Sequence, residues 1–240
     1  MLEKEKHNLV LLHFAGGSSY SYNFIKEQFS NDKHFSALEL PGRGKRFDHT
    51  KVKTYQEAVE DYLNQIKKSI FDSGPYIIYG HSMGALLGYL ICQKLQEEKL
   101  PMPKKLVVSG KKAPNIPREN KIAHLPDEEF WKQIIALGGI PEEMKNSPEL
   151  IEYYLPILRH DLELTESYQY EKKPKLNIPI DVFYGSEEAH EEDLAGWRKE
   201  TTNEVTITKL EGNHFFIFKH VDFFTNYFRN IHKTLNHNYV

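Results

Sequence analysis

Residues 76–90 read Tyr-Ile-Ile-Tyr-Gly-His-Ser-Met-Gly-Ala-Leu-Leu-Gly-Tyr-Leu, two apolar runs joined by a Gly-x-Ser-x-Gly turn. The first run is short and rich in β-branched and aromatic residues, which predicts a buried strand. The second opens a segment, 84–98, whose apolar residues recur at three- and four-residue spacing, which predicts a helix. A serine at a strand-to-helix turn is typical of a nucleophile elbow. Ser82 is therefore the candidate nucleophile.

The glycines of this turn have a physical reason to be there. An elbow strains the serine backbone and brings strand and helix so close that Gly80 and Gly84 leave little room for β-carbons. The helix start also places backbone N–H groups and the positive end of the helix dipole beside the Ser82 oxygen. Because Gly-x-Ser-x-Gly alone arises by chance, the strand and helix around it carry the argument.

Other short apolar runs predict a sheet, and amphipathic segments between them predict helices. The strands are expected at 9–14, 35–40, 76–79, 106–108, 180–184 and 205–208, and helices at 55–71, 84–98 and 221–235. This alternation is typical of an α/β fold with a mostly parallel central sheet flanked by helices on both faces. Together with the elbow it predicts the α/β-hydrolase fold, as one domain over residues 1–240.

The strand rhythm stops between residues 113 and 179. Helical segments at 127–137 and 148–159 replace it, and Ser147-Pro148-Glu149 places proline at a first helical position. We expect this insertion to be a helical lid over the site rather than a purely structural appendage.

Composition excludes several classes of function. The chain has 240 residues and a formal net charge of −3, with 31 basic residues scattered among 34 acidic ones, so neither a nucleic-acid nor a membrane partner is expected. Residues 1–6 lack the pattern of a signal peptide, and the longest apolar run is about half of the ~20 residues that a membrane span needs. The single Cys92 is expected to be a buried thiol. We therefore expect a cytoplasmic protein, by default a monomer.

A serine nucleophile needs a base, which in this fold follows the last strand. Strand 205–208 leads to Glu-Gly-Asn-His-Phe-Phe at 211–216, which makes His214 the candidate general base among twelve histidines. The acid should follow the preceding strand, where Gly185 leads to Ser-Glu-Glu. Glu188 takes the position of the usual Gly-x-x-Asp pattern, with Glu187 and Asp193 as rivals.

An oxyanion needs two preorganised donors, one from the residue after the nucleophile and one from the loop after the first strand. These are the backbone N–H of Met83 and that of Ala15, with Phe14 as the alternative to Ala15. The pair Gly16-Gly17 lacks the spacing of a nucleotide-binding motif. No Cys/His cluster has metal-ligand spacing, so neither a cofactor nor a metal is expected.

Motifs along nearly the whole chain resemble the type II (external, editing) thioesterases of nonribosomal peptide and polyketide synthesis. They are Phe-Ala-Gly-Gly-Ser at 14–18, Leu-Pro-Gly-Arg-Gly-Lys-Arg at 40–46, Gly-His-Ser-Met-Gly-Ala at 80–85, Leu-Pro-Asp-Glu-Glu-Phe at 125–130, Leu-Gly-Gly-Ile-Pro at 137–141, Leu-Pro-Ile-Leu-Arg-His-Asp at 155–161 and Gly-Asn-His-Phe-Phe at 212–216. The elbow is shared by many hydrolases, whereas Pro-Gly-Arg-Gly-x-Arg and the motifs of residues 125–161 are more particular to this group.

The resemblance implies hydrolysis of acyl groups thioesterified to the 4′-phosphopantetheine arm of a carrier-protein domain, through Ser82 and His214. Two positions depart from the family pattern: Glu188 stands where aspartate is usual, and His13 stands where proline commonly precedes phenylalanine. An acyl-CoA thioesterase or a small-molecule carboxylesterase on the same scaffold is the alternative function.

Overall fold

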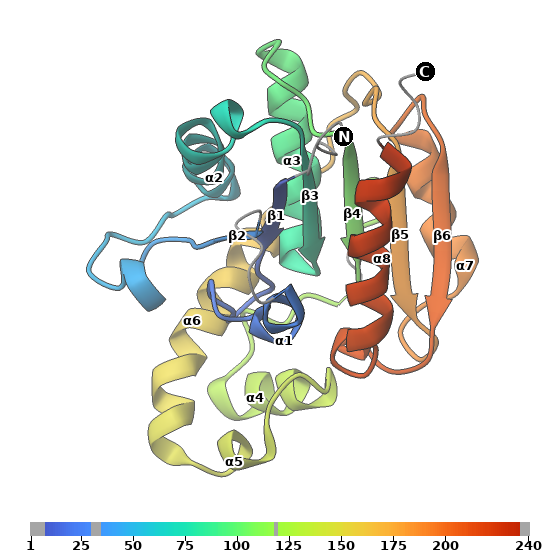
Figure 1. Cartoon of the computed structure of the whole chain (residues 1–240). Helices are drawn as coiled ribbons and strands as arrows, with labels where there is room; N and C mark the ends of the chain where they lie inside the picture. The colour runs from blue at the N-terminus through green and yellow to red at the C-terminus, as the bar shows by residue number, and fades with distance from the viewer. Residues whose placement is uncertain (1–7, 30–34, 118–119, 236–240) are drawn as a thin grey trace.

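In the computed structural model, which describes residues 8–29, 35–117 and 120–235, six parallel strands form one sheet (Figure 1). The order across it is β2-β1-β3-β4-β5-β6. The strands are β1 (Asn8–Leu12), β2 (Phe35–Leu38), β3 (Tyr76–His81), β4 (Lys105–Ser109), β5 (Ile180–Gly185) and β6 (Val205–Leu210). The expected parallel sheet is confirmed, while residues 1–6, where no signal peptide is expected, lie outside the described part of the chain.

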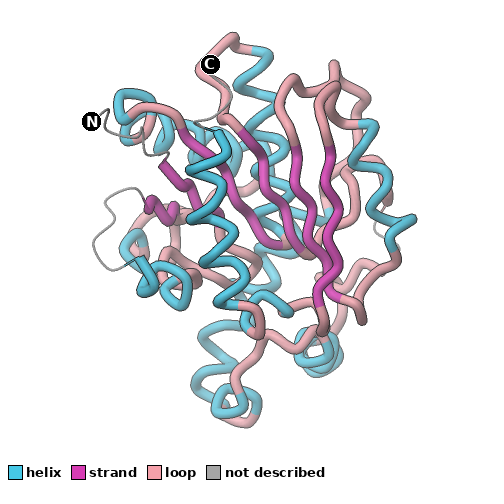
Figure 2. The backbone as a smooth tube through the Cα atoms, turned by 45° about the vertical axis from the view of Figure 1, so that its right-hand side comes forward, coloured by secondary structure: helices cyan, strands magenta, loops and turns pink. Residues whose placement is uncertain are grey.

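Helices cover both faces of the sheet, as Figure 2 shows by the helical tubes in front of and behind the strands. The larger ones are α2 (Tyr55–Ser69) and α3 (Met83–Glu97) on one face and α8 (Val221–Leu235) on the other, with α1 (Asn23–Lys26) beside α8. The remaining short pieces are η1 (Glu27–Phe29), η2 (Gly44–Arg46), η3 (Phe71–Ser73), α7 (Glu191–Leu194), η4 (Ala195–Lys199) and η5 (Phe216–Phe218). None of the described helices is long and apolar enough to cross a membrane.

The two faces of the sheet explain why its strands are continuous apolar runs. Val10 and Leu12 point into the core that contains α2 and α3, whereas Leu9 and Leu11 point into the core that contains α8. All four are fully buried. Because successive side chains of a strand point to opposite faces, a strand covered on both faces must be apolar throughout.

Three further helices lie between β4 and β5 in the chain, beyond the carboxyl ends of the strands (Figure 1). They are α4 (Asp127–Ala136), α5 (Glu142–Lys145) and α6 (Pro148–Glu166), and we call this group the cap. The cap has its own apolar cluster, which includes Phe130, Trp131 and Leu162. The helices expected at 127–137 and 148–159 are both present, and Pro148 occupies the first turn of α6.

Helix α6 continues seven residues beyond the expected end at 159. The extension is rich in polar residues, a pattern that indicates the end of an apolar helix face. Two of its carboxylates, those of Asp161 and Glu166, are nevertheless buried. Glu166 accepts hydrogen bonds from the backbone N–H groups of Ile122 and Ala123. Asp161 is paired within the candidate site. Tertiary partners therefore hold the last two turns of α6 in the helix, a factor that periodicity does not report.

Candidate active site

The turn at Ser82 is as tight as an elbow requires. Ser82 has φ 54° and ψ −110°, a conformation that L-residues rarely adopt. A β-carbon on Gly80 would lie 2.1 Å from the carbonyl oxygen of Gly84, and one on Gly84 would lie 2.1 Å from that of Leu12. The Ser82 N–H donates to the carbonyl of Ser109 on β4 at 2.8 Å. Neighbouring strand ends thus hold the serine in its strained turn.

His214 lies on the turn that follows β6, with its Nε2 3.0 Å from Ser82 Oγ. Gly212 opens this turn with φ +126°, a value that favours glycine. Gly185, at the end of β5, lets the turn approach closely, since a β-carbon there would lie 2.4 Å from the Asn213 carbonyl oxygen. The structure therefore brings residues 82 and 214, which are 132 positions apart, into hydrogen-bond contact.

Glu188 lies on the other side of the imidazole, with its Oε2 2.6 Å from His214 Nδ1. Its Oε1 accepts the backbone N–H of Gly185 at 2.9 Å, which orients the carboxylate despite the extra methylene of glutamate. Of the two rivals, Glu187 is exposed, and Asp193 pairs with Lys112 at 3.1 Å. An Nδ1–H that donates to Glu188 leaves the Nε2 lone pair facing the serine hydroxyl, the tautomer that a general base needs.

Most backbone N–H groups of the loop after β1 donate hydrogen bonds to acceptors within the protein. At 2.8–2.9 Å, the N–H of Gly16 donates to Asp161 Oδ2 and that of Gly17 to the Phe14 carbonyl. The N–H of Ser18 donates to Ser21 Oγ, and that of Ser19 to Glu39 Oε1. Those of Phe14 and Ala15 donate to no acceptor in the described part of the chain. Met83 lies in the first turn of α3, where N–H groups have no partner within the helix. The expected donors are thus the ones left free for a substrate oxygen.

The peptide unit between Phe14 and Ala15 is held from its carbonyl side. The Phe14 carbonyl oxygen accepts the Gly17 N–H at 2.9 Å and a hydrogen bond from His13 Nδ1 at 2.9 Å. Because a trans peptide is planar, fixing this C=O also fixes the opposite direction of the Ala15 N–H. The His13 Nε2 in turn lies 3.4 Å from the Leu40 amide. Burial, with the charge of Arg43 as a lesser cause, lowers the pKa of His13 to about 4.

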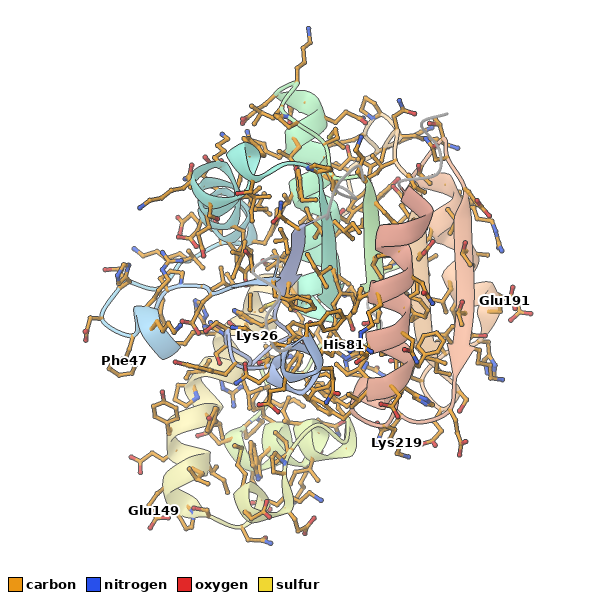
Figure 3. All side chains as sticks on the ribbon, viewed as in Figure 1. Lys26, Phe47, His81, Glu149, Glu191 and Lys219 are labelled. Carbon is orange, nitrogen blue, oxygen red and sulfur yellow. The ribbon has the colours of Figure 1, made fainter. Side chains whose placement is uncertain are left out.

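His81, next to the nucleophile in sequence, has its own environment. Its ring is fully buried and packs against that of His214, with the centroids 4.9 Å apart, and Figure 3 shows it near the middle of the molecule. Its Nδ1 lies 2.9 Å from Ser109 Oγ, which bonds the Tyr79 hydroxyl at 2.9 Å. Burial and the neighbouring His214 lower the pKa of His81 well below its usual value. A neutral wall thus backs the His214 ring.

Arg43 and Asp161 form a buried ion pair at the same end of the sheet. Two parallel hydrogen bonds of 2.5 and 2.6 Å join the guanidinium to the carboxylate, and Asp161 is fully inaccessible. Burial by itself raises the pKa of a carboxyl group, but the hydrogen bonds and charge of Arg43 outweigh it and hold the pKa of Asp161 below its usual range. Asp161 is therefore ionised in the folded chain.

A cavity of about 600 Å³ joins these groups. Ser82, His214, Glu188 and Ala15 line one part of it, at the carboxyl ends of the strands. Apolar side chains of the cap and of the connection between α4 and α5 line another part: Ile134, Leu137, Ile140, Met144, Tyr154, Ile157, Leu158 and Leu162. Among the described residues, no group of three or more His, Cys, Asp or Glu side chains is arranged to hold a metal ion. The cavity suits a largely apolar ligand with one polar reacting centre.

The family model of the thioesterase domain matches residues 7–235. This chain belongs to the thioesterase family. Such enzymes hydrolyse thioester bonds, so this thioesterase has the enzyme class that the motifs predicted. The family resemblance and the α/β-hydrolase fold expected from the sequence are thereby confirmed.

Individual relatives of the thioesterase cover nearly its whole length. The gramicidin S biosynthesis protein GrsT of Aneurinibacillus migulanus is 30% identical over 217 residues, which are 89% of this chain and 84% of that protein. Among solved structures, ClbQ from the colibactin NRPS/PKS pathway superposes with a TM-score of 0.87 at 28% identity, covering 96% of this chain and 98% of that one. The RedJ thioesterase of the prodiginine pathway in Streptomyces coelicolor gives a TM-score of 0.83 at 28% identity, covering 92% and 89%.

Sequence reasoning singled out Ser82, His214 and Glu188 in this thioesterase but gave no role to Arg43, Asp161 or His13. Arg43 and Asp161 both lie within the family motifs, at 40–46 and 155–161, and the charged residue within the Pro-Gly-Arg-Gly turn is the available signal. The turn motif does not indicate that Arg43 pairs with Asp161, which lies 118 positions later in the chain.

Proposed function

We propose that this thioesterase hydrolyses acyl thioesters carried on the 4′-phosphopantetheine arm of carrier-protein domains, and so frees synthases that are misprimed or stalled. The observation that carries the proposal is the contact of His214 with both Ser82 Oγ at 3.0 Å and Glu188 Oε2 at 2.6 Å, at one end of an apolar cavity. By their names, one relative belongs to gramicidin S biosynthesis and another to the colibactin NRPS/PKS pathway, which supports a carrier-bound substrate.

In the proposed mechanism, Ser82 is the nucleophile and His214 the general base. His214 Nε2 takes the hydroxyl proton as Ser82 Oγ bonds to the thioester carbonyl carbon. Collapse of the tetrahedral intermediate breaks the C–S bond, and the proton passes from His214 to the departing thiol. Water, deprotonated by the same imidazole, then attacks the carbonyl carbon of the acyl-serine. Collapse of this second intermediate breaks the C–Oγ bond, His214 returns the proton to Ser82 Oγ, and the carboxylic acid leaves. Glu188 orients His214 and stabilises its cationic form.

The oxyanion of each tetrahedral intermediate accepts the N–H groups of Met83 and Ala15. Both amides are free of other acceptors in the described part of the chain, and the Ala15 amide is aimed by the bonds to the Phe14 carbonyl. Such preorganised donors act where charge develops, so they stabilise the transition state more than the bound substrate.

The cap serves as the lid of this site within a single catalytic domain. Its apolar side chains line the cavity together with the residues at the strand ends, which suits an acyl chain. We further propose that the enzyme works as a cytoplasmic monomer, without cofactor or metal. Light scattering of the purified protein tests the monomeric state, which a stable dimer would contradict. Fractionation of cells tests the location, which a membrane-bound pool would contradict.

Substrate competition tests the proposed activity. Hydrolysis of one acyl group is compared on a phosphopantetheinyl carrier protein, on coenzyme A and in a nitrophenyl ester. The expected result is the highest kcat/KM on the carrier, and Ser82→Ala should lower it by at least ~10³-fold. A preference for coenzyme A or for the nitrophenyl ester would instead indicate an acyl-CoA thioesterase or a carboxylesterase.

The acid is tested by a set of three substitutions. Glu188→Gln should lower kcat by about 10²-fold or more, because the amide does not stabilise the protonated imidazole. Glu187→Gln and Asp193→Asn are matched controls, since one side chain is exposed and the other pairs with Lys112. A near-normal rate for Glu188→Gln, with a loss in either control, would move the assignment.

A further inference from the structure

The buried pair of Arg43 and Asp161 joins two distant parts of the fold. Arg43 lies in the turn that follows β2, and Asp161 lies in α6 of the cap. Neither ion has significant contact with solvent, with exposures of 2% and 0%. Removing two charges from water costs more than their attraction regains unless further hydrogen bonds satisfy them. The further hydrogen bonds of Arg43 and Asp161 go to the loop after β1.

Both ions bond the backbone of the loop after β1. The Gly16 N–H donates to Asp161 Oδ2 at 2.8 Å, and Arg43 donates to the carbonyl of Gly17 at 3.2 Å. These are the residues directly after Ala15, the proposed oxyanion donor. The ion pair therefore fixes the peptide units that follow this donor, while the Gly17 N–H closes the turn onto the Phe14 carbonyl before it.

The same face of α6 also presses on the loop and lines the cavity. A β-carbon on Gly16, whose φ is +74°, would lie 2.4 Å from Cδ2 of Leu158. Leu158 and Leu162 line the cavity, and Asp161 stands three residues after the first and one before the second. Since residues three and four apart share a helix face, Leu158 and Asp161 act on the loop together. Figure 3 shows Glu149, in the first turn of α6, at the far end of the cap from the sheet.

We propose that Asp161 is a positioning residue for catalysis: held by Arg43, its carboxylate captures the Gly16 N–H and so aims the Ala15 N–H at the substrate oxygen. Through Asp161 the cap and the oxyanion hole are assembled as one unit. The inference rests on the proposed Ser82 mechanism, because it assigns the Ala15 amide to the oxyanion of that reaction.

Asp161→Asn tests the proposal, because the side chain keeps its size but loses the charge that grips both Arg43 and Gly16. The substrate is an acetyl thioester of N-acetylcysteamine, which reproduces the end of the pantetheine arm. We expect kcat to fall by about 10²-fold, the effect of losing one oxyanion donor, with KM changed less than about threefold. Asp61→Asn is the matched control, since Asp61 forms a similar bidentate pair with Arg46 but its own hydrogen bonds go to Arg46 and Gln65 rather than to the loop, and its kcat should stay within about twofold of wild type.

A transition-state analogue separates positioning from general damage to the fold. An acyl trifluoromethyl ketone forms a hemiketal oxyanion with a catalytic serine, so its Ki should rise in Asp161→Asn by a factor similar to the fall in kcat. The Ki of the corresponding amide, which forms no oxyanion, should change less than about threefold. Rates are taken per folded site, counted by saturating fluorophosphonate labelling. Arg43→Lys, which keeps the cation but not the fork, should give an intermediate loss of about tenfold.

Equal kcat and Ki values per site in wild type and Asp161→Asn would overturn the proposal, as would parallel losses for the ketone and the amide. The proposed function fails separately. A wild-type enzyme that cleaves the small thioester and ignores acyl-carrier protein would refute the carrier substrate, yet the ratio of wild-type to variant values on the small thioester and the ketone would still test Asp161.

Discussion

Ser82 and Ala15 line one cavity, but the chain around each is held by a different kind of interaction. Around Ser82, backbone packs against backbone: a β-carbon on Gly80 would meet the Gly84 carbonyl, and one on Gly84 would meet the Leu12 carbonyl at the end of β1. Around Ala15, buried charges hold backbone amides, through Asp161 in particular. The elbow is therefore held by backbone contacts that involve no charged group, whereas the loop depends on charged side chains from two distant segments and on their ionisation.

The largest effect is expected at the buried charge. Asp161→Ala leaves the Arg43 guanidinium without its carboxylate in a buried site, which should lower the free energy of unfolding by about 3–5 kcal/mol. Urea denaturation measures this loss. The double variant Arg43→Met with Asp161→Leu removes both charges and should recover most of the lost stability, because the cost comes mainly from the orphaned ion. A loss under 1 kcal/mol for Asp161→Ala would show that the loop does not depend on charge.

The next effect concerns the backbone contact at the elbow. Gly84→Ala places a β-carbon against the Leu12 carbonyl oxygen and should lower the free energy of unfolding by about 2–3 kcal/mol, the cost of overpacking a rigid site. Gly88→Ala, one turn later in the same helix, meets only side-chain atoms at 3.2–3.4 Å. Its helix propensity gain of up to about 1 kcal/mol offsets that contact. Equal denaturation midpoints for the two variants would contradict this account of the elbow.

Lowering the pH should reduce the free energy of unfolding through His13 before Asp161 contributes. Below pH 6.5 the unfolded chain binds a proton at His13 that the folded chain, with its pKa lowered to about 4, does not bind. The free energy of unfolding should therefore fall by about 1.4 kcal/mol per pH unit more in wild type than in His13→Asn, between pH 6.5 and about 4. Asp161 adds its own loss only below about pH 4, where the unfolded chain protonates this carboxylate while the folded chain keeps it ionised. Parallel stability curves for the two proteins over pH 4–6.5 would show that His13 takes up protons normally.

The smallest effect is expected at the second ion pair of the same motif. Arg46 and Asp61 form a bidentate pair at 2.6 and 2.7 Å, but their side chains are 24% and 20% exposed. Asp61→Ala should cost at most about 1 kcal/mol, because water screens the pair and solvates the remaining charge. A cost equal to that of Asp161→Ala would mean that burial is not what separates the two pairs.

Much of the fold is readable from the sequence because its signals are local. The apolar runs that become β3 and β5, and the spacing that becomes α8, lie within single segments, so periodicity alone predicts them. The end of α6 is not readable in this way. Its last turns carry Asp161 and Glu166, polar residues that become buried only because distant backbone groups bond them.

In the candidate site too, some residues have a local sequence signal and others do not. Ser82, His214 and Glu188 each follow a strand at a spacing that sequence reasoning can use, and the structure places the three side chains in contact. The roles of Arg43 and Asp161 depend on a pairing across 118 residues, which no local pattern reports. Sequence therefore indicates which groups react more readily than it indicates what positions them.

Trapping the acyl-enzyme identifies the residue that attacks the thioester. The wild-type enzyme is mixed with an acyl-phosphopantetheinyl carrier protein, quenched in acid within its first turnover and digested for mass spectrometry. We expect the peptide with Ser82 to gain the mass of the acyl group, and this adduct to decay as free acid appears. Release of the acid with no adduct at any quench time, together with full turnover by Ser82→Ala, would contradict this expectation.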